Sequence, residues 1–123
     1  MGRARINITY TARGPSGKVY IGRASCYCSS PETALDYRWR NHHMAKEGYG
    51  NAEVDVWITG DWYSPNWGAI RGREQQMIDA YGGVGSPFVA NINRGVSKDN
   101  PFGRTYHNLS DARFGNVAPY TGN

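Results

Sequence analysis

Alternating apolar and polar residues open the chain and predict a strand over residues 5–11. A period of two puts alternate side chains on opposite faces of a half-buried strand. The apolar face would hold Ile6, Ile8 and Tyr10, and the polar face Asn7, Thr9 and Thr11. The Gly-Pro-Ser-Gly sequence at 14–17 favours a turn, and residues 18–24 have the pattern of a returning strand. We therefore expect an antiparallel hairpin that brings Tyr10 close to Tyr20.

A helix is expected after the hairpin, ending at Gly48. Ser29 and Glu32 can form a capping box, and Ser30 followed by Pro31 is an alternative helix start. The buried side of this helix would be anchored by Leu35 and Trp39. Four residues separate Arg38 from His42, so the two side chains should share one face of the helix, one turn apart.

A third strand and a second helix continue the pattern. Residues 54–59 alternate and end at Gly60-Asp61, and a helix should then run from Ser64-Pro65 to Gly82-Gly83. Its inward stripe would contain Ile70, Met77, Ile78 and Tyr81. Glu74 falls on the same stripe.

A carboxylate on a core-facing stripe costs several kcal/mol unless a partner compensates its charge. One candidate partner for Glu74 is a buried ion pair with Arg38 or Arg40. The other is a divalent cation at the floor of a cleft. The helix pattern does not choose between them.

Residues from about 82 onward are rich in Gly, Asn and Pro and should wrap the core as loops and short pieces. We therefore predict an α+β fold, a small three-stranded antiparallel sheet flanked by helices in β-β-α-β-α order, with a loop-rich C-terminal tail.

Four aromatic residues cluster near the third strand and second helix, and core packing is the favoured role for them over base stacking. These are Trp57, Trp62, Tyr63 and Trp67.

Length and charge limit the functional classes. A chain of 123 residues suits one domain. It has no apolar run of about 18 residues for a membrane span, and its first residues lack the apolar segment of a signal peptide.

Residues 1–46 hold eight Lys/Arg and two acidic residues, whereas residues 47–99 hold four Lys/Arg and seven acidic residues. The basic half, which carries the paired tyrosines, suits a polyanionic partner, and a solvated basic face is the alternative.

Cys26 and Cys28 are separated by a single residue. That spacing is too short for a comfortable disulfide, and no second Cys/His pair offers a zinc site. We therefore expect both cysteines to be reduced.

The order of these elements and residues resembles the GIY-YIG nuclease superfamily. The first motif reads Ile8-Thr9-Tyr10, where the family has Gly-Ile-Tyr, and the second reads Tyr20-Ile21-Gly22. The helix with an arginine, the third strand and the helix with a glutamate follow in the family's order. The resemblance covers roughly residues 5 to 93. It implies a single nuclease domain over 1–123, the C-terminal toxin domain of a larger protein.

The resemblance implies a set of site residues. The paired tyrosines would be Tyr10 and Tyr20, one of them positioning or deprotonating the attacking water. Charge on the phosphate would be neutralised by Arg38, for which Arg40 is the alternative. The remaining positions would be His42 beside the arginine, Glu74 as the metal-binding carboxylate, and Asn91 or Asn93 as the closing asparagine.

Chemically, these residues suit phosphodiester hydrolysis. Mg²⁺, or another divalent cation such as Mn²⁺, on Glu74 would assist the leaving group. A tyrosine has a pKa of about 10, so a base role would need cations such as Arg38, Lys18 or Arg23 to lower it. His42 is the alternative proton acceptor at neutral pH. DNA would be held by Lys18, Arg23 and Arg40.

No second DNA-reading module is visible in the sequence, and the tail resembles the C-terminal ends of bacterial polymorphic toxins borne on Rhs-type carriers. The resemblance therefore implies a monomeric antibacterial DNase, secreted by a bacterial secretion system and delivered to the cytoplasm of target bacteria. It also implies a cognate immunity protein. Two alternatives are a stand-alone repair or restriction-like endonuclease and a nucleic-acid-binding module without catalysis.

Overall fold

The computed structural model describes residues 4–123 as an α+β fold built on a three-stranded antiparallel sheet, which confirms the predicted class. The strands are β1 (Arg5–Arg13), β2 (Val19–Tyr27) and β3 (Gly50–Thr59), in the order β2-β1-β3. The predicted turn joins β1 to β2, with Gly17 at φ 84°, where glycine is favoured.

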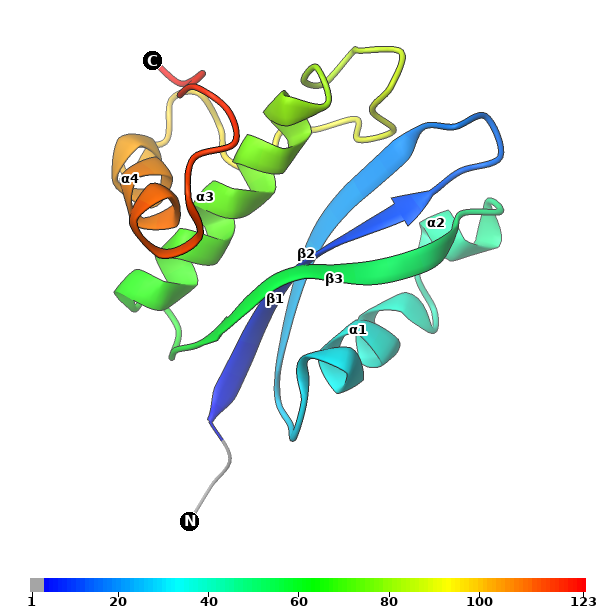
Figure 1. Ribbon diagram of the computed structural model, residues 1–123, viewed down its shortest axis with the longest axis horizontal. Coiled ribbons are helices and arrows are strands. Elements are labelled where there is room, and N and C mark those ends of the chain that lie inside the picture. The colour runs from blue at the N-terminus through cyan, green and yellow to red at the C-terminus, as the bar shows by residue number, and fades with distance from the viewer. Residues whose placement is uncertain (1–3) are drawn as a thin grey trace.

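Helices cover both faces of the sheet (Figure 1). On one face lie α1 (Pro31–Trp39) and the short α2 (His43–Lys46). On the other face lies α3 (Pro65–Ala80), and α4 (Gly103–Phe114) packs on the outer side of α3. Between residues 4 and 123, no helix combines the length and the apolar character needed to span a membrane.

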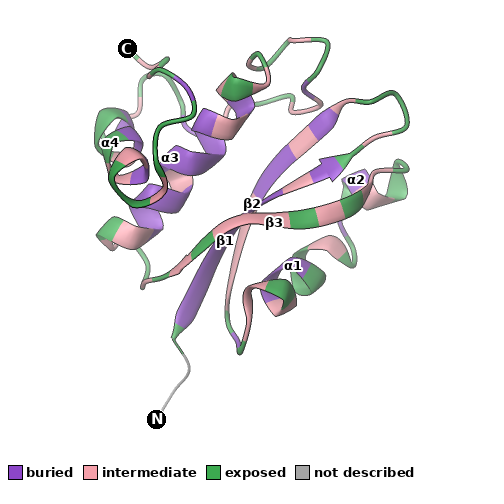
Figure 2. Cartoon of the chain, viewed as in Figure 1, coloured by how far each residue is buried: buried purple, intermediate pink, exposed green. Residues whose placement is uncertain are grey.

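The central strand β1 is buried on both faces, not on one as its alternation suggested (Figure 2). Ile8 and Tyr10 are fully buried beneath α1, in a core that includes Leu35 and Trp39. The polar face is buried as well, because α3 covers it. There Asn7 donates to the carbonyl of Gly60, and Thr9 donates to Asp55, which also binds Arg73 at 2.8 Å. Asn7 and Thr9 are therefore satisfied inside the protein.

The helix predicted to run to Gly48 is broken in two. Ser30, not Ser29, is the N-cap, with its hydroxyl accepting from the Thr33 amide at 3.2 Å. The first segment ends at Trp39, and His42 adopts an extended conformation that caps α2. Arg38 and His42 therefore do not share one helix face. The break allows the imidazole to fold inward against the aromatic core.

Two expectations about individual side chains are corrected. Cys26 and Cys28 form a disulfide rather than two free thiols. The chain bends as it leaves β2, so their Cα atoms lie 5.3 Å apart, inside the usual range of about 4.4–6.8 Å.

The four clustered aromatic residues are mostly exposed rather than packed in the core. Trp67 is buried, but Trp57, Trp62 and Tyr63 are 51%, 53% and 82% exposed. The reason is their position, since they lie on the outer part of β3 and on the loop that enters α3. Three of them contact one another: Trp62, Tyr63 and Trp67.

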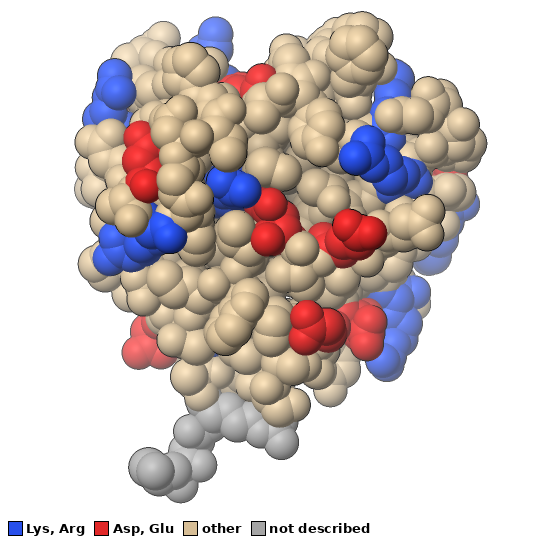
Figure 3. All heavy atoms as spheres, viewed as in Figure 1, with Lys and Arg blue, Asp and Glu red and all other residues tan. Residues whose placement is uncertain are grey.

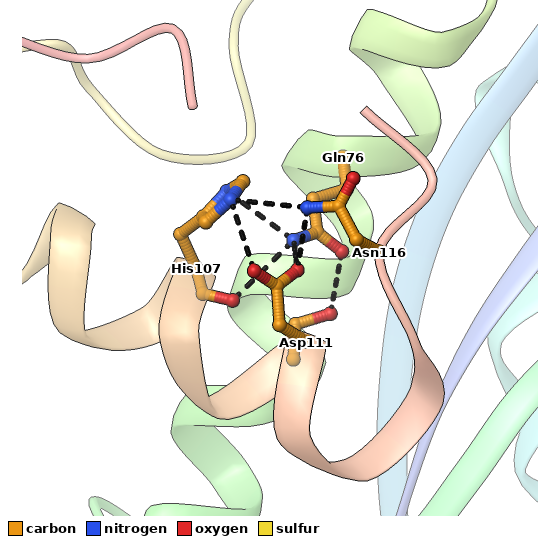
Figure 4. Close-up of polar contacts among 5 residues, drawn as sticks. Gln76, His107, Asp111 and Asn116 are labelled. Carbon is orange, nitrogen blue, oxygen red and sulfur yellow. Dashed lines mark hydrogen bonds and ion pairs between the residues drawn. The ribbon is translucent and has the colours of Figure 1, made fainter. Parts of the chain in front are cut away.

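The C-terminal tail contains the 12-residue helix α4, which the loss of apolar periodicity concealed. Its contact with α3 includes a polar network (Figure 4). Gln76 donates to Asp111 at 2.7 Å and accepts from Ser110 at 2.7 Å. His107 completes the network beside Gln76 and Asn116. A helix held by hydrogen bonds leaves little apolar signal in its sequence.

Close approach of α3 and α4 depends on Gly72, where an added Cβ would collide with the backbone carbonyl of Tyr106. We expect Gly72→Ala to lower the free energy of unfolding by about 1–3 kcal/mol, because backbone cannot yield as a side chain can. At Gly68 an added Cβ would meet only side-chain atoms of Tyr106 and Leu109, at 3.0 Å and 3.1 Å, so Gly68→Ala is the milder matched variant. Urea denaturation would measure both. A gain of about 1 kcal/mol at position 72, as helix propensity alone predicts, would contradict this packing.

Candidate active site

A cleft of about 640 Å³ opens at the β2 edge of the sheet. It is lined by residues from β2, α1, α2 and α3 and by the loop over residues 90–95. The polar and charged side chains along it are Tyr20, Arg23, Arg38, His43, Glu47, Glu74, Asn91, Asn93 and Arg94. Six of the predicted site and binding residues therefore meet in one cleft: Tyr20, Arg23, Arg38, Glu74, Asn91 and Asn93.

Tyr10 and Tyr20 lie side by side as the hairpin predicted, with ring centroids 6.3 Å apart. Gly22 makes this arrangement possible. It is the cross-strand neighbour of Tyr10, and a Cβ there would collide with the Tyr10 ring. The glycine of the Tyr-Ile-Gly motif thus leaves space for the Tyr10 ring, which is fully buried beside Tyr20 and does not line the cleft itself.

Burial raises the pKa of both tyrosines rather than lowering it. For Tyr10, burial and the neighbouring Tyr20 outweigh the opposing charge of Arg38. Burial is also the main cause for Tyr20, followed by the negative charge of Glu74. Both hydroxyls are therefore protonated at neutral pH and suited to positioning a water or a phosphate oxygen. The Tyr10 hydroxyl is buried and makes no hydrogen bond of good geometry among the described residues, although Arg38 lies close enough to lower its pKa.

His42 is oriented as a hydrogen-bond donor. Its Nδ1 accepts the Met44 amide hydrogen at 3.0 Å, which places the proton of the neutral ring on Nε2. That Nε2 is buried and has no partner in the part of the chain described. The ring lies 5.1 Å from the Tyr20 ring, centroid to centroid. This geometry disfavours the proton-acceptor role expected for His42.

Protonation of His42 should destabilise the fold. Burial, then the charges of Arg38 and His43, lower the pKa of His42 below 6.5. Because the folded pKa lies below the unfolded one, the unfolded chain takes up the proton first as the pH falls. We expect the free energy of unfolding to decline as the pH drops from 6.5 through the folded pKa.

The matched variant for this prediction is His42→Asn, which keeps a side-chain acceptor for the Met44 amide but does not titrate. Urea denaturation between about pH 8 and about pH 5 would compare the two proteins. Other titrating groups contribute equally to both curves, so the difference isolates His42. Parallel pH dependences would contradict the prediction.

Glu74 is buried on α3 and pairs with Arg23 of β2, not with Arg38 or Arg40. Arg23 Nε lies 3.2 Å from Glu74 Oε1. Burial nevertheless raises the pKa of Glu74, against the opposing charges of Arg23 and Arg71. The carboxylate therefore lies at the cleft with its charge incompletely compensated.

A divalent cation fits this site through a single carboxylate. The described residues contain no group of three or more His, Cys, Asp or Glu side chains that could hold a metal. Mg²⁺, however, often binds through one or two carboxylates and completes its shell with water and substrate phosphate. Glu74 lines the cleft, and burial disfavours its charged form, so a cation bound there would stabilise the carboxylate, which suits that mode.

Of the remaining predicted residues, Asn91 is fixed and Asn93 is free to contact a ligand. Asn91 pairs with the backbone of Ile21, accepting from its amide at 3.0 Å and donating to its carbonyl at 2.7 Å. Asn93 lines the cleft and is exposed. Neither Lys18 nor Arg40 is among the cleft residues within the described chain.

Sequence reasoning missed other charged residues of this region. Glu47, His43 and Arg94 line the cleft, but each comes from a short helix or loop without a periodic signal. Arg71 binds the carbonyl of Gly95 at 3.2 Å, and Gly95 leaves space for the Glu74 carboxylate. Only the helical spacing of Arg71 and Glu74, three residues apart, offered a signal.

Charge on the surface is mixed. Figure 3 shows acidic and basic side chains interspersed on one face, so the basic N-terminal half does not make that face uniformly positive.

No protein-family model, curated protein or solved structure matches the chain. The chemistry of the cleft itself must therefore indicate the function.

Proposed function

We propose that this domain is a metal-dependent endonuclease of the GIY-YIG type that hydrolyses DNA phosphodiester bonds. The observation that carries the proposal is the convergence of Tyr20, Arg38 and buried Glu74 in one cleft, with Tyr10 beside Tyr20. Tyr20, Arg38 and Glu74 come from three separate elements of the fold, β2, α1 and α3. Packing alone does not explain why polar groups from all three should meet around an open space.

The chain's own residues suit the demands of phosphodiester hydrolysis. Arg38, exposed at the end of α1, can bind a nonbridging phosphate oxygen through a charge-assisted hydrogen bond. The protonated hydroxyl of Tyr20 can position the attacking water. When bound at Glu74, Mg²⁺ would supply Lewis-acid stabilisation of the phosphate.

We further propose the biological setting implied by the resemblance, an antibacterial toxin delivered to the cytoplasm of target bacteria and neutralised by an immunity protein. Three arginines in the cleft, Arg23, Arg38 and Arg94, suit either a DNA backbone or an acidic protein that blocks it. Bacterial growth during expression of the domain would test this setting. Toxicity should disappear when Glu74 is replaced.

Plasmid cleavage by the purified protein tests the biochemical proposal. We expect supercoiled plasmid to be nicked or linearised with Mg²⁺ or Mn²⁺ and to stay intact with EDTA. Plasmid that remains intact with every divalent cation tried would refute the DNase proposal. Cleavage of RNA in the same experiment would instead assign the chemistry to a different substrate.

A further inference from the structure

A second pocket, of about 270 Å³, lies between the start of α3 and the start of α4. We call it the aromatic pocket, since four rings line it: Tyr63, Trp67, Phe102 and Tyr106. The Tyr63 and Trp67 rings lie 4.9 Å apart, and the Trp67 and Tyr106 rings meet edge-on at 5.9 Å. Gly68 also lines it, so no side chain projects into the pocket from that position.

The chain itself leaves the aromatic pocket open. Two of its rings are largely exposed, with Tyr63 at 82% and Phe102 at 59%. Tyr63 also has φ 64°, a left-handed conformation that tyrosine seldom adopts. Exposed aromatic rings gathered around a hollow typically mark a binding surface rather than a folding core.

Arg71 connects the aromatic pocket with the cleft. Its guanidinium carbon lies 5.5 Å from the centre of the Trp67 ring and 5.3 Å from that of Tyr106. At its other side, Nη2 binds the carbonyl of Gly95, which lines the cleft. Its Nε has no acceptor among the described residues. The Arg71 side chain therefore lies between the rings of the aromatic pocket and the cleft that is the proposed phosphate site.

The spacing along α3 suits a nucleic-acid strand. Trp67, Arg71 and Glu74 follow one another at about one helical turn, so they lie on the same side of α3. At about 1.5 Å per residue, Trp67 and Glu74 are roughly 10 Å apart along the axis. That distance corresponds to about three steps of a DNA strand in B-form geometry, at about 3.4 Å per step.

We propose that the aromatic pocket binds a nucleobase of the strand whose phosphate occupies the cleft. This inference rests on the proposed function. Each base has a π face that stacks on aromatic rings whatever its sequence, and Arg71 would add a cation beside the stacked base. A base paired within a duplex cannot enter, so the substrate strand must be single-stranded or locally unstacked at this point.

Charge favours a nucleotide over an apolar peptide as the occupant. Within the described chain, none of the residues that line the aromatic pocket is acidic. Burial also lowers the pKa of Arg71, which shows that its charge is incompletely solvated. Arg71 lies outside the pocket lining but contacts two of its rings, so a nucleotide could bring an anionic phosphate to this cation and an apolar side chain could not.

The test compares two probes that differ only in their bases. A fluorescein-labelled oligothymidylate of about ten nucleotides and an abasic oligomer of equal length are titrated with protein in EDTA, and anisotropy gives the affinity of each. We expect the base-bearing probe to bind about 5- to 150-fold more tightly. Tyr63→Ala and Phe102→Ala should lose most of this preference. The matched control is Tyr37→Ala, an exposed ring (63%) on α1, across the sheet.

Equal affinity for the two probes would overturn the proposal, as would a preference that survives in both pocket variants. Failure of the proposed function has a different signature, because binding in EDTA does not require cleavage. If the protein cleaves plasmid but binds both probes equally, the nuclease proposal stands and the base-binding proposal is refuted. If the protein prefers the base-bearing probe but cleaves no substrate, base binding by the pocket stands and the nuclease proposal is refuted.

Discussion

Glu74→Gln should reduce metal-dependent DNA cleavage by at least about a hundredfold, comparable to removing a group that stabilises a transition state. Glutamine has nearly the same shape and can still accept from Arg23, which lies 3.2 Å from the carboxylate. It carries no charge, however, and cannot hold a divalent cation as a carboxylate does. Initial rates of plasmid nicking with Mg²⁺ would measure the loss.

The fold of this variant should survive, and its pH dependence offers a check. Burial raises the pKa of Glu74, so ionisation of this group costs the wild-type protein stability. As the pH rises above the ordinary value of 4.5 and through the folded pKa, wild type should lose stability relative to Glu74→Gln. Denaturation curves at several pH values would show whether the variant remains folded during the cleavage experiment.

Glu53→Gln is the matched control, since Glu53 is an exposed carboxylate on β3 outside the cleft. It should cleave at the wild-type rate. A Glu74→Gln protein that also kept the wild-type rate would reduce Glu74 to a structural ion-pair partner. A variant that bound DNA as wild type does, but did not cleave it, would separate an enzyme from a binding module.

Local signals predicted the hairpin and the start of α3, and gave the start of α1 as one of two alternatives. Ser30 and Ser64 each cap a helix that begins with proline, and their hydroxyls accept amide hydrogens three residues on. Such signals act within a few residues and are legible in one sequence. The proximity of the Tyr10 and Tyr20 rings followed from the same local pattern, because the turn fixes which strands meet.

Features that depend on tertiary contacts were not predictable in the same way. The break before His42 occurs where that side chain packs against Tyr20 and Trp39, which no local rule specifies. Arg23 as the partner of Glu74 requires β2 to lie against α3. Helix α4 was missed because its buried residues are Gly103, His107 and Ser110 rather than apolar side chains.

The sequence consequently predicted which residues meet at the candidate site better than it predicted their protonation states. Tyr20, Arg38 and Glu74 do meet in one cleft. The protonation states were not foreseen, since desolvation and hydrogen-bond direction follow from the folded surroundings. Burial keeps the tyrosines protonated, and the Met44 amide makes His42 a donor.

Tyr10→Phe should impair cleavage by about a hundredfold or more while leaving the fold at least as stable as wild type. The Tyr10 hydroxyl is buried and makes no hydrogen bond of good geometry among the described residues, with only Arg38 close enough to lower its pKa, and this burial costs the folded state free energy. Phenylalanine keeps the ring against Gly22 and Trp39 and removes only that hydroxyl. Plasmid nicking and urea denaturation of the same preparation would measure the two effects.

Tyr27→Phe provides the control, because Tyr27 is 56% exposed and lies outside the cleft. A Tyr10→Phe protein with the wild-type cleavage rate would make Tyr10 a packing residue. A loss of stability above about 1 kcal/mol would instead show that the hydroxyl is hydrogen-bonded in solution. Opposite changes in stability and activity are the signature of a group retained for function, since substitution would otherwise relieve the cost of its burial. The Tyr10→Phe variant therefore distinguishes a catalytic tyrosine pair from a hairpin whose tyrosines only pack.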